Sequence, residues 1–118
     1  MATTYASDFI DDGYSVEKTL VAETGEHGEL AFTYRPATAD QVARLIDTGG
    51  NDQQYIERAV EMLATEKGGL LLGWNLKDRH GEVVKVNRGN LARVRRKLLV
   101  KIIRQVFFED APEASLKN

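Results

Sequence analysis

Apolar and polar residues alternate in two short stretches near the start of the chain. Residues 30–34 alternate strictly, and residues 16–22 alternate less regularly. A glycine-bearing segment over residues 24–28 separates the two runs. Alternation with a period of two is typical of half-buried strands, and two such runs around a short loop with glycine indicate a β-hairpin. The chain therefore opens, after a polar N-terminal stretch, with a predicted hairpin.

The apolar spacing then changes to a helical period. Thr38 and Gln41 have the spacing of a capping box, in which each side chain bonds the other residue's backbone N–H, so a helix is predicted to begin there. The glycine pair at residues 49–50 ends this short helix. Apolar residues at helical spacing over residues 55–63 predict a second helix, which the glycine pair at residues 68–69 terminates.

The last third of the chain predicts a second hairpin followed by a long helix. Residues 70–76 and 83–86 are apolar runs on either side of a polar turn, and the first run carries Trp74. We expect this tryptophan in the core or in a buried interface, because one face of the strand must pack. Asn87 or Asn90 then caps one continuous helix. Its one-sided apolar stripe consists of Leu91, Val94, Leu98, Leu99, Ile102, Ile103, Val106 and Phe107.

These elements follow one another in the order ββ-α-α-ββ-α. Antiparallel β-hairpins packed with three helices make an α+β fold. A length of 118 residues and a hydrophobic content of 42% suit one domain with one core. We expect a flexible N-terminal arm over residues 1–14, a single α+β domain over residues 15–108 and a flexible C-terminal tail over residues 109–118.

Composition argues against several classes of protein. The chain has no cysteine, which excludes a disulfide framework and thiolate chemistry. Its apolar runs are far shorter than the roughly 20 residues of a membrane-spanning helix. Its first residues lack the basic and apolar regions of a signal peptide. We therefore expect a cytoplasmic protein with no membrane partner.

Charge is segregated along the sequence although the net charge is only −2. Residues 1–82 carry 15 acidic and 7 basic side chains, and residues 83–118 carry 3 acidic and 9 basic ones. The two parts therefore have net charges of −8 and +6. Such asymmetry predicts that the basic part docks on the acidic body of its own or a neighbouring chain, or that it faces an anionic partner.

Six basic residues of the predicted final helix are the candidate partner-binding residues. They are Arg93, Arg95, Arg96, Lys97, Lys101 and Arg104. Four of them share a polar face, whereas Arg95 falls in the middle of the apolar stripe, where an unpaired guanidinium is very costly to bury. Three interpretations stay open: a solvated face, a nucleic-acid surface, or an amphipathic helix that docks on a protein. A pI of about 5.7 and the lack of aromatic residues on the basic face weigh against nucleic acid.

No set of residues in the sequence suggests catalysis. His27 and His80 both fall in predicted turns beside glycine, where an imidazole is normally solvated. No ligand spacing resembles a structural zinc pattern, and the glycine pairs lack the residues of a phosphate-binding loop. We therefore expect no catalytic, cofactor-binding or metal-binding residues, no cofactor and no enzymatic activity.

Two segments resemble small tail assembly proteins of long-tailed bacteriophages and prophages. Residues 71–86, LLGWNLKDRHGEVVKV, contain an apolar strand ending in Trp, a polar turn with Gly and then a V-x-V pattern, and a helix with spaced Leu and Ile follows. Residues 32–38, FTYRPAT, precede a short helix in a similar way. The resemblance covers residues 30–107 and points to the tail assembly chaperones.

This resemblance implies a non-enzymatic assembly factor in the cytoplasm of the host bacterium. Such proteins bind tail components such as the tape-measure or tail-tube protein, keep them soluble and self-associate. We expect a homo-oligomer on a second ground as well, since an eight-residue apolar stripe exceeds what a thin four-stranded sheet must cover. The alternative is a small nucleic-acid-binding regulator that uses the basic C-terminal helix, and a small hydrolase is a third, more distant one.

Overall fold

The computed structural model describes residues 10, 13–47, 52–65 and 67–109. Within them the chain forms an antiparallel sheet of three strands with four helices, so the predicted α+β class is confirmed. The strands are β1 (Val16–Leu20), β2 (Leu30–Tyr34) and β3 (Leu71–Trp74). The helices are α1 (Ala39–Ile46), α2 (Asp52–Leu63), α3 (Arg88–Leu91) and α4 (Arg96–Phe108).

The predicted first hairpin is confirmed and supplies two of the three strands. β2 lies in the centre of the sheet, and both of its neighbours run antiparallel to it. The register pairs Phe32 with Lys18 on one side and with Trp74 on the other. Because successive side chains of a strand point to opposite faces of the sheet, every second residue of β2 points into the core, and Phe32 and Tyr34 are buried there.

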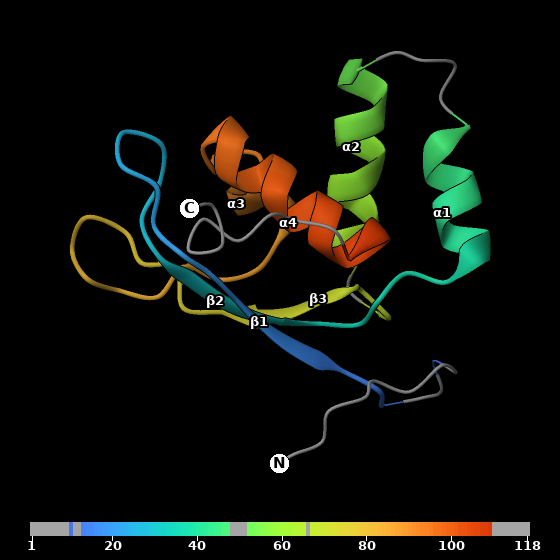
Figure 1. Ribbon diagram of the computed structural model, residues 1–118, viewed down its shortest axis with the longest axis horizontal. Helices are drawn as coiled ribbons and strands as arrows, with labels where there is room; N and C mark the ends of the chain where they lie inside the picture. The colour runs from blue at the N-terminus through green and yellow to red at the C-terminus, as the bar shows by residue number, and fades with distance from the viewer. Residues whose placement is uncertain (1–9, 11–12, 48–51, 66, 110–118) are drawn as a thin grey trace, which may run out of the picture.

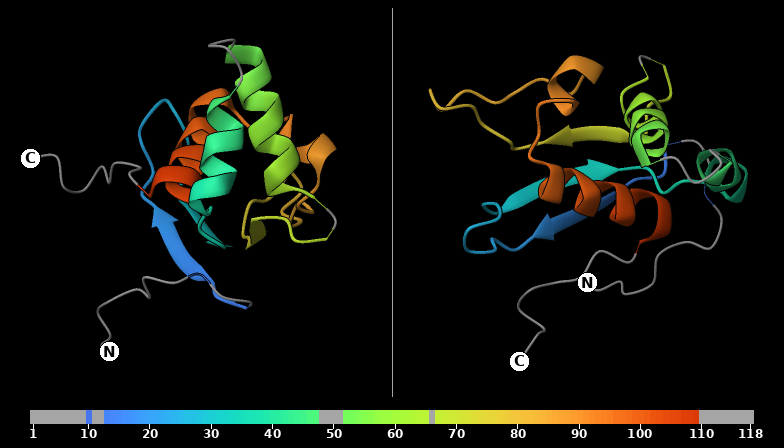
Figure 2. Two further views of the ribbon diagram at one scale, coloured as in Figure 1. Left: turned by 90° about the vertical axis from the view of Figure 1, so that its right-hand side faces the viewer. Right: turned by 90° about the horizontal axis from the view of Figure 1, so that it is seen from above.

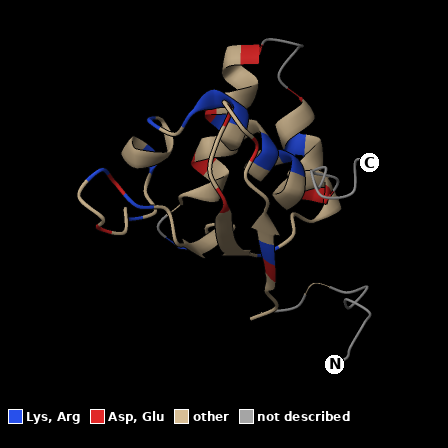
Figure 3. Cartoon of the chain, turned by 60° about the vertical axis from the view of Figure 1, so that its left-hand side comes forward, with Lys and Arg blue, Asp and Glu red and all other residues tan. Residues whose placement is uncertain are grey.

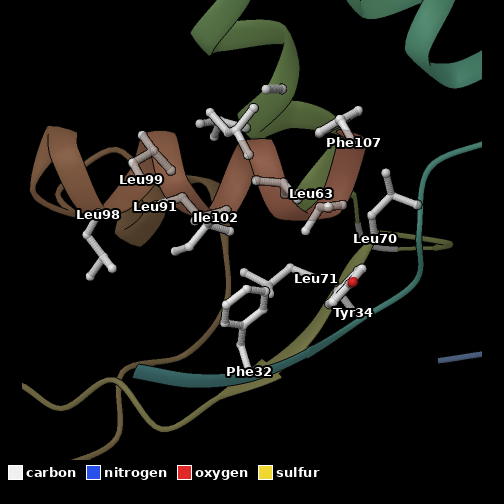
Figure 4. Packing of buried hydrophobic residues seen from close by; sticks show 14 of the residues in the cluster. Phe32, Tyr34, Leu63, Leu70, Leu71, Leu91, Leu98, Leu99, Ile102 and Phe107 are labelled. Atoms are coloured by element: carbon white, nitrogen blue, oxygen red, sulfur yellow. The ribbon is translucent and has the colours of Figure 1, made fainter. Parts of the chain in front are cut away.

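The helices gather on one face of the sheet (Figure 1). In the views of Figure 2, α1, α2 and α4 lie beside one another over the strands. Figure 4 shows the resulting core, in which Ile102 of α4 lies opposite Phe32 and Leu71 of the sheet and Leu63 of α2 packs alongside. One continuous cluster of buried side chains therefore joins the sheet to all four helices.

The capping box at the start of α1 is present as predicted. The side chain of Thr38 accepts a hydrogen bond from the backbone N–H of Gln41, and Gln41 Oε1 accepts one from the backbone N–H of Thr38 at 2.9 Å. Two N–H groups that lack partners in the helix are thereby satisfied. The helix start therefore coincides with the local sequence pattern that predicted it.

The prediction of a single long C-terminal helix is wrong, because residues 92–95 separate two helices. Asn87 caps the short helix α3, as one of the two predicted caps, and α4 begins only at Arg96. Arg95 has non-helical backbone angles, φ −53° and ψ 137°, and an exposed side chain. A continuous helix would have buried its guanidinium in the apolar stripe, and the break avoids that cost while Leu91 and Leu98 stay buried on either side. The chain therefore has a fourth helix where three were predicted.

The second hairpin is only half present, because residues 83–86 form no strand. They are joined to the first arm by an isolated bridge between Lys77 and Val83 and by a hydrogen bond from Val84 N to Leu76 O of 2.8 Å. The carbonyl of Val84 accepts the indole N–H of Trp74 at 2.6 Å. Trp74 itself packs against the core but is only half-buried, so it is less buried than predicted. The second arm is thus held by side-chain and isolated backbone contacts rather than by a ladder.

The premise for self-association also changes. Seven of the eight residues of the apolar stripe are buried within one chain, and Val94 is half-buried. Because these side chains belong to one cluster with buried residues of the sheet, α1 and α2, the stripe needs no second copy. Self-association stays a prediction without this support. Most of the predicted arm over 1–14 and tail over 109–118, and the glycine pair at 49–50, lie outside the described residues.

Candidate functional site

Two loops, over residues 22–28 and 77–82, project past the start of α4 (Figure 1). A groove of about 930 Å³ lies beside them. One wall is the turn between β1 and β2, residues 22–28, called the acidic turn below. The opposite wall comes from residues 76–78 and 84, and the end is closed by Asn90 and residues 93–95. Leu98 of α4 contributes to the base. The groove therefore draws on three separate parts of the sequence.

Local geometry shapes the acidic turn. Glu23 and His27 form an isolated bridge, with backbone hydrogen bonds of 3.0 and 3.1 Å. Gly25 has a φ of +78°, a conformation that glycine adopts without strain, so the chain can reverse tightly at this point. The turn carries two carboxylates, those of Glu23 and Glu26, and the imidazole of His27.

Helix α4 fixes the acidic turn through its lysines (Figure 3). Lys101 is only 13% exposed, and its Nζ contacts both Glu23 Oε1 and His27 Nε2. Because an ammonium can only donate, Nε2 accepts, and the ring proton lies on Nδ1, which donates to the carbonyl of Gly28 at 2.8 Å. One turn earlier on the helix, Lys97 pairs with Glu26 at 3.3 Å. Both carboxylates of the turn are thereby neutralised within the chain.

The opposite wall is a tight polar turn anchored on Trp74. Asp78 Oδ1 accepts the backbone N–H groups of His80 and Glu82 at 2.8 and 3.1 Å, which satisfies this carboxylate inside its own loop. The indole hydrogen bond to Val84 holds the returning arm against β3. These contacts place Leu76 and Val84 at the groove. Val83, the residue before Val84, is 57% exposed and does not line the groove.

The groove combines an aliphatic floor with a basic rim. Its apolar lining consists of Leu76, Val84, Val94 and Leu98, with Ala22 at the edge. Its basic side chains are those of Lys77, Arg93 and Arg95. The Arg95 guanidinium donates to the backbone carbonyl of Glu26 at 3.3 Å. The side chains of Lys77 and Arg93 make no hydrogen bond or ion pair with any described residue.

The structure separates the six predicted partner-binding residues into three groups. Arg93 and Arg95 line the groove. Lys97 and Lys101 do not face outward together, because they hold the acidic turn. Arg96 and Arg104 lie on the other side of α4, around a smaller pocket of about 180 Å³ that Asp52, Tyr55 and Ile56 of α2 also line.

The charge segregation of the sequence is partly satisfied inside the chain. Among the described residues, the basic part pairs with the acidic body at Glu23 and Glu26 of the acidic turn, and also at Glu61 of α2, which Arg88 contacts at 3.6 Å. Of the groove's aliphatic residues, Val94 and Leu98 were predicted only as part of the apolar stripe, and none was predicted to line a groove. The sole signal for Leu76 and Val84 was the pairing of their two runs around a turn, which does not say what lies across from them.

The two histidines have different settings. His27 lines the groove and has both ring nitrogens engaged, at Lys101 and at Gly28. His80 is exposed in the tip of the 77–82 loop. In the described parts of the chain, no three His, Cys, Asp or Glu residues lie together as a metal site would need. Among the described helices, none has the length and apolar character that crossing a bilayer requires.

A strongly perturbed pKa lies away from the groove, at Tyr34 beneath the end of α4. Its hydroxyl donates to Glu109 Oε2 at 2.9 Å and accepts from Gln105 Nε2 at 2.8 Å. Burial, followed by the hydrogen bond to the Glu109 carboxylate, raises the pKa of Tyr34 to about 12, although the hydrogen bond from Gln105 acts in the opposite direction. This buried network ties the central strand to the C-terminal end of α4.

Comparison of the chain with protein-family models, with curated proteins and with solved structures finds no match.

Proposed function

We propose that this chain is a non-enzymatic binding module that takes a segment of a partner protein into the groove. The observation that carries the proposal is the groove itself, where an aliphatic floor is bordered by three basic side chains, two of which have no hydrogen-bond or ion-pair partner among the described residues. Concave apolar surfaces with a few convergent polar groups are the usual form of a binding site. The partners proposed are phage tail components, the tape-measure or tail-tube protein, as the resemblance of residues 30–107 implies.

A binding role suits the groove better than catalysis does. His27 is the groove residue best suited to act as a base, and both of its ring nitrogens are already hydrogen-bonded within the chain. The carboxylates of Glu23, Glu26 and Asp78 are likewise engaged by Lys101, Lys97 and backbone N–H groups. Groups held in this way shape a surface, and they are poorly placed to transfer protons.

The alternative, a nucleic-acid-binding regulator, requires a continuous basic face on the C-terminal helix. Two of the four residues of that face, Lys97 and Lys101, pair with acidic side chains of the β1–β2 turn. Phosphates attracted to the helix would meet Glu23 and Glu26 beside it. This arrangement favours a protein partner.

Two neighbouring valines give a matched test of the groove. Val84 lines it and Val83 does not, although both stand in the same loop. The tagged chain is co-expressed with a phage tail-tube protein and, separately, with a tape-measure protein from the same source, and the captured protein is quantified. We expect Val84→Asp to reduce capture by about tenfold or more, since it places a charge on the apolar floor, and Val83→Asp to leave it near the wild-type level.

Circular dichroism of both variants shows whether the fold is intact. Equal capture by Val84→Asp and the wild type would reject the groove as the binding site. If the wild type captures neither tail protein, the tail assembly role is wrong. Salt-sensitive binding of the wild type to random duplex DNA, lost in Arg93→Glu, would support the regulator instead.

A further inference from the structure

We infer that the groove selects a segment in which carboxylate side chains accompany apolar ones, an inference that rests on the proposed function. The occupant is a stretch of a partner protein whose apolar side chains lie on Leu76, Val84, Val94 and Leu98 while its Asp or Glu residues meet Lys77, Arg93 and Arg95. Three features of the described residues lead to this choice.

The first feature is that the acidic groups around the groove are already neutralised. Glu23 is bound by Lys101, Glu26 by Lys97, and Asp78 accepts two backbone N–H groups of its own loop. A basic occupant would have to share each of these carboxylates with an internal partner that already offsets its charge. The acidic residues of the walls therefore offer little to a positively charged ligand.

The second feature is that the basic groups around the groove are available. The side chains of Lys77 and Arg93 have no hydrogen-bond or ion-pair partner among the described residues, and both are exposed. Arg95 makes one long contact, to the backbone carbonyl of Glu26, and its other guanidinium N–H groups can still donate. The groove thus presents available positive charge, although the acids and bases that line it are equal in number.

The third feature distinguishes a peptide from other anions. The apolar floor is aliphatic, and no Phe, Tyr or Trp is among the described residues that line the groove. Single-stranded nucleic acids depend on aromatic side chains to stack their bases, so this floor does not suit them. Aliphatic side chains of a polypeptide fit such a floor, and carboxylates fit the rim.

Two fluorescent peptides serve as probes, one in which Leu alternates with Glu and one in which Leu alternates with Lys. Binding of each to the full chain is measured by fluorescence anisotropy at low and high salt. We expect the Leu/Glu peptide to bind more tightly, and its affinity to fall as salt screens the rim charges. Arg93→Glu and Lys77→Glu should each weaken it about three- to tenfold, and the double variant should prefer the Leu/Lys peptide.

Arg79 provides the matched control, because it is an exposed arginine of the same loop as Lys77 and does not line the groove. Arg79→Glu should bind the Leu/Glu peptide as the wild type does. Equal affinity of the wild type for both peptides, or an equal loss in Arg79→Glu and Arg93→Glu, would overturn the selection of acidic segments. A concentration-dependent dimer that Val84→Asp abolishes would also overturn it, by making a second copy the occupant.

The outcomes separate this inference from the proposed function. If capture of a tail protein depends on Val84 but the peptides show no preference for Glu, only the acidic selection is wrong. If capture does not depend on Val84, the groove fails as a partner site and the inference fails with it.

Discussion

Removing the hydroxyl of Tyr34 tests the buried network at the end of α4. The Tyr34 side chain is 0% exposed, and Gln105 is 7% exposed beside it. Tyr34→Phe keeps the ring in the core but deletes two hydrogen bonds, one to Glu109 Oε2 and one from Gln105 Nε2. The exposed Glu109 carboxylate can turn to water, whereas the Gln105 amide is left buried without this acceptor.

The expected cost follows from that asymmetry. Leaving a buried polar group unsatisfied costs about 1–3 kcal/mol, and a hydrogen bond to a charged acceptor contributes about 1.5–3 kcal/mol, less where the acceptor regains water. We expect Tyr34→Phe to lower the free energy of unfolding by about 2 kcal/mol at neutral pH. Adding Gln105→Leu should recover part of this loss, because the unsatisfied amide is then removed as well.

The raised pKa of Tyr34 gives this prediction a pH signature. The phenol ionises near pH 10 in the unfolded chain and near pH 12 in the folded one. Between these values the unfolded state holds fewer protons, so wild-type stability falls by about 1.4 kcal/mol per pH unit from this group. The Tyr34→Phe variant has no such group, and the advantage of the wild type over it should therefore shrink above pH 10 and approach zero by about pH 11.5.

Urea denaturation of both proteins at several pH values measures the difference directly, since other titrating groups affect both alike. Near-ultraviolet absorbance of tyrosinate should also show one late-ionising tyrosine in the wild type that is missing from the variant. A loss below about 0.5 kcal/mol at neutral pH would refute the proposed cost. A difference in stability that stays constant up to pH 11 would refute the burial of the phenol.

Three further changes test the packing and the groove walls. A Cβ on Gly69 would lie 2.5 Å from a backbone carbonyl oxygen, so Gly69→Ala should lower the free energy of unfolding by more than about 2 kcal/mol, measured by thermal unfolding. Gly68 has a φ of +81° but open space around it, so Gly68→Ala should lower it by only about 1 kcal/mol. Trp74→Phe should lose about 1 kcal/mol with the indole hydrogen bond and should speed amide exchange at Val84 N, and unchanged exchange would argue against that anchor. Lys101→Met should lower the free energy of unfolding by about 1–2 kcal/mol and speed amide exchange in the acidic turn. Lys97 is exposed, so Lys97→Met should lower it by at most about 0.5 kcal/mol. Equal losses would contradict the different burial of the two ion pairs.

Patterns within a few residues predicted the elements of the fold well. The strict alternation of residues 30–34 gave the central strand, and the spacing of Thr38 and Gln41 gave the start of α1. Both signals are local, because strand alternation and helix capping depend on neighbours in the chain. The apolar stripe of the C-terminal segment was identified correctly, yet its division into α3 and α4 was not.

The error over α3 and α4 shows the limit of periodicity. The spacing from Leu91 to Leu98 suits one helix, and Arg95 was the only sign against it. Whether such an arginine is paired, projects into solvent or breaks the helix depends on what packs around it. In the structure the backbone carbonyl of Glu26, which is distant in sequence, accepts a hydrogen bond from the Arg95 guanidinium, and the Arg95 backbone is not helical.

The sequence by itself determined which faces are apolar, where three of the four predicted strands and most helix starts lie, and that a basic C-terminal part follows an acidic body. Only the tertiary structure decided that Lys101 meets Glu23 and His27, and that the 22–28 turn, the 76–84 loop and the start of α4 enclose a groove. Periodicity records the backbone geometry of single elements, whereas pairing between elements depends on loop paths and on the balance of burial against desolvation. That balance is set when the whole chain packs together.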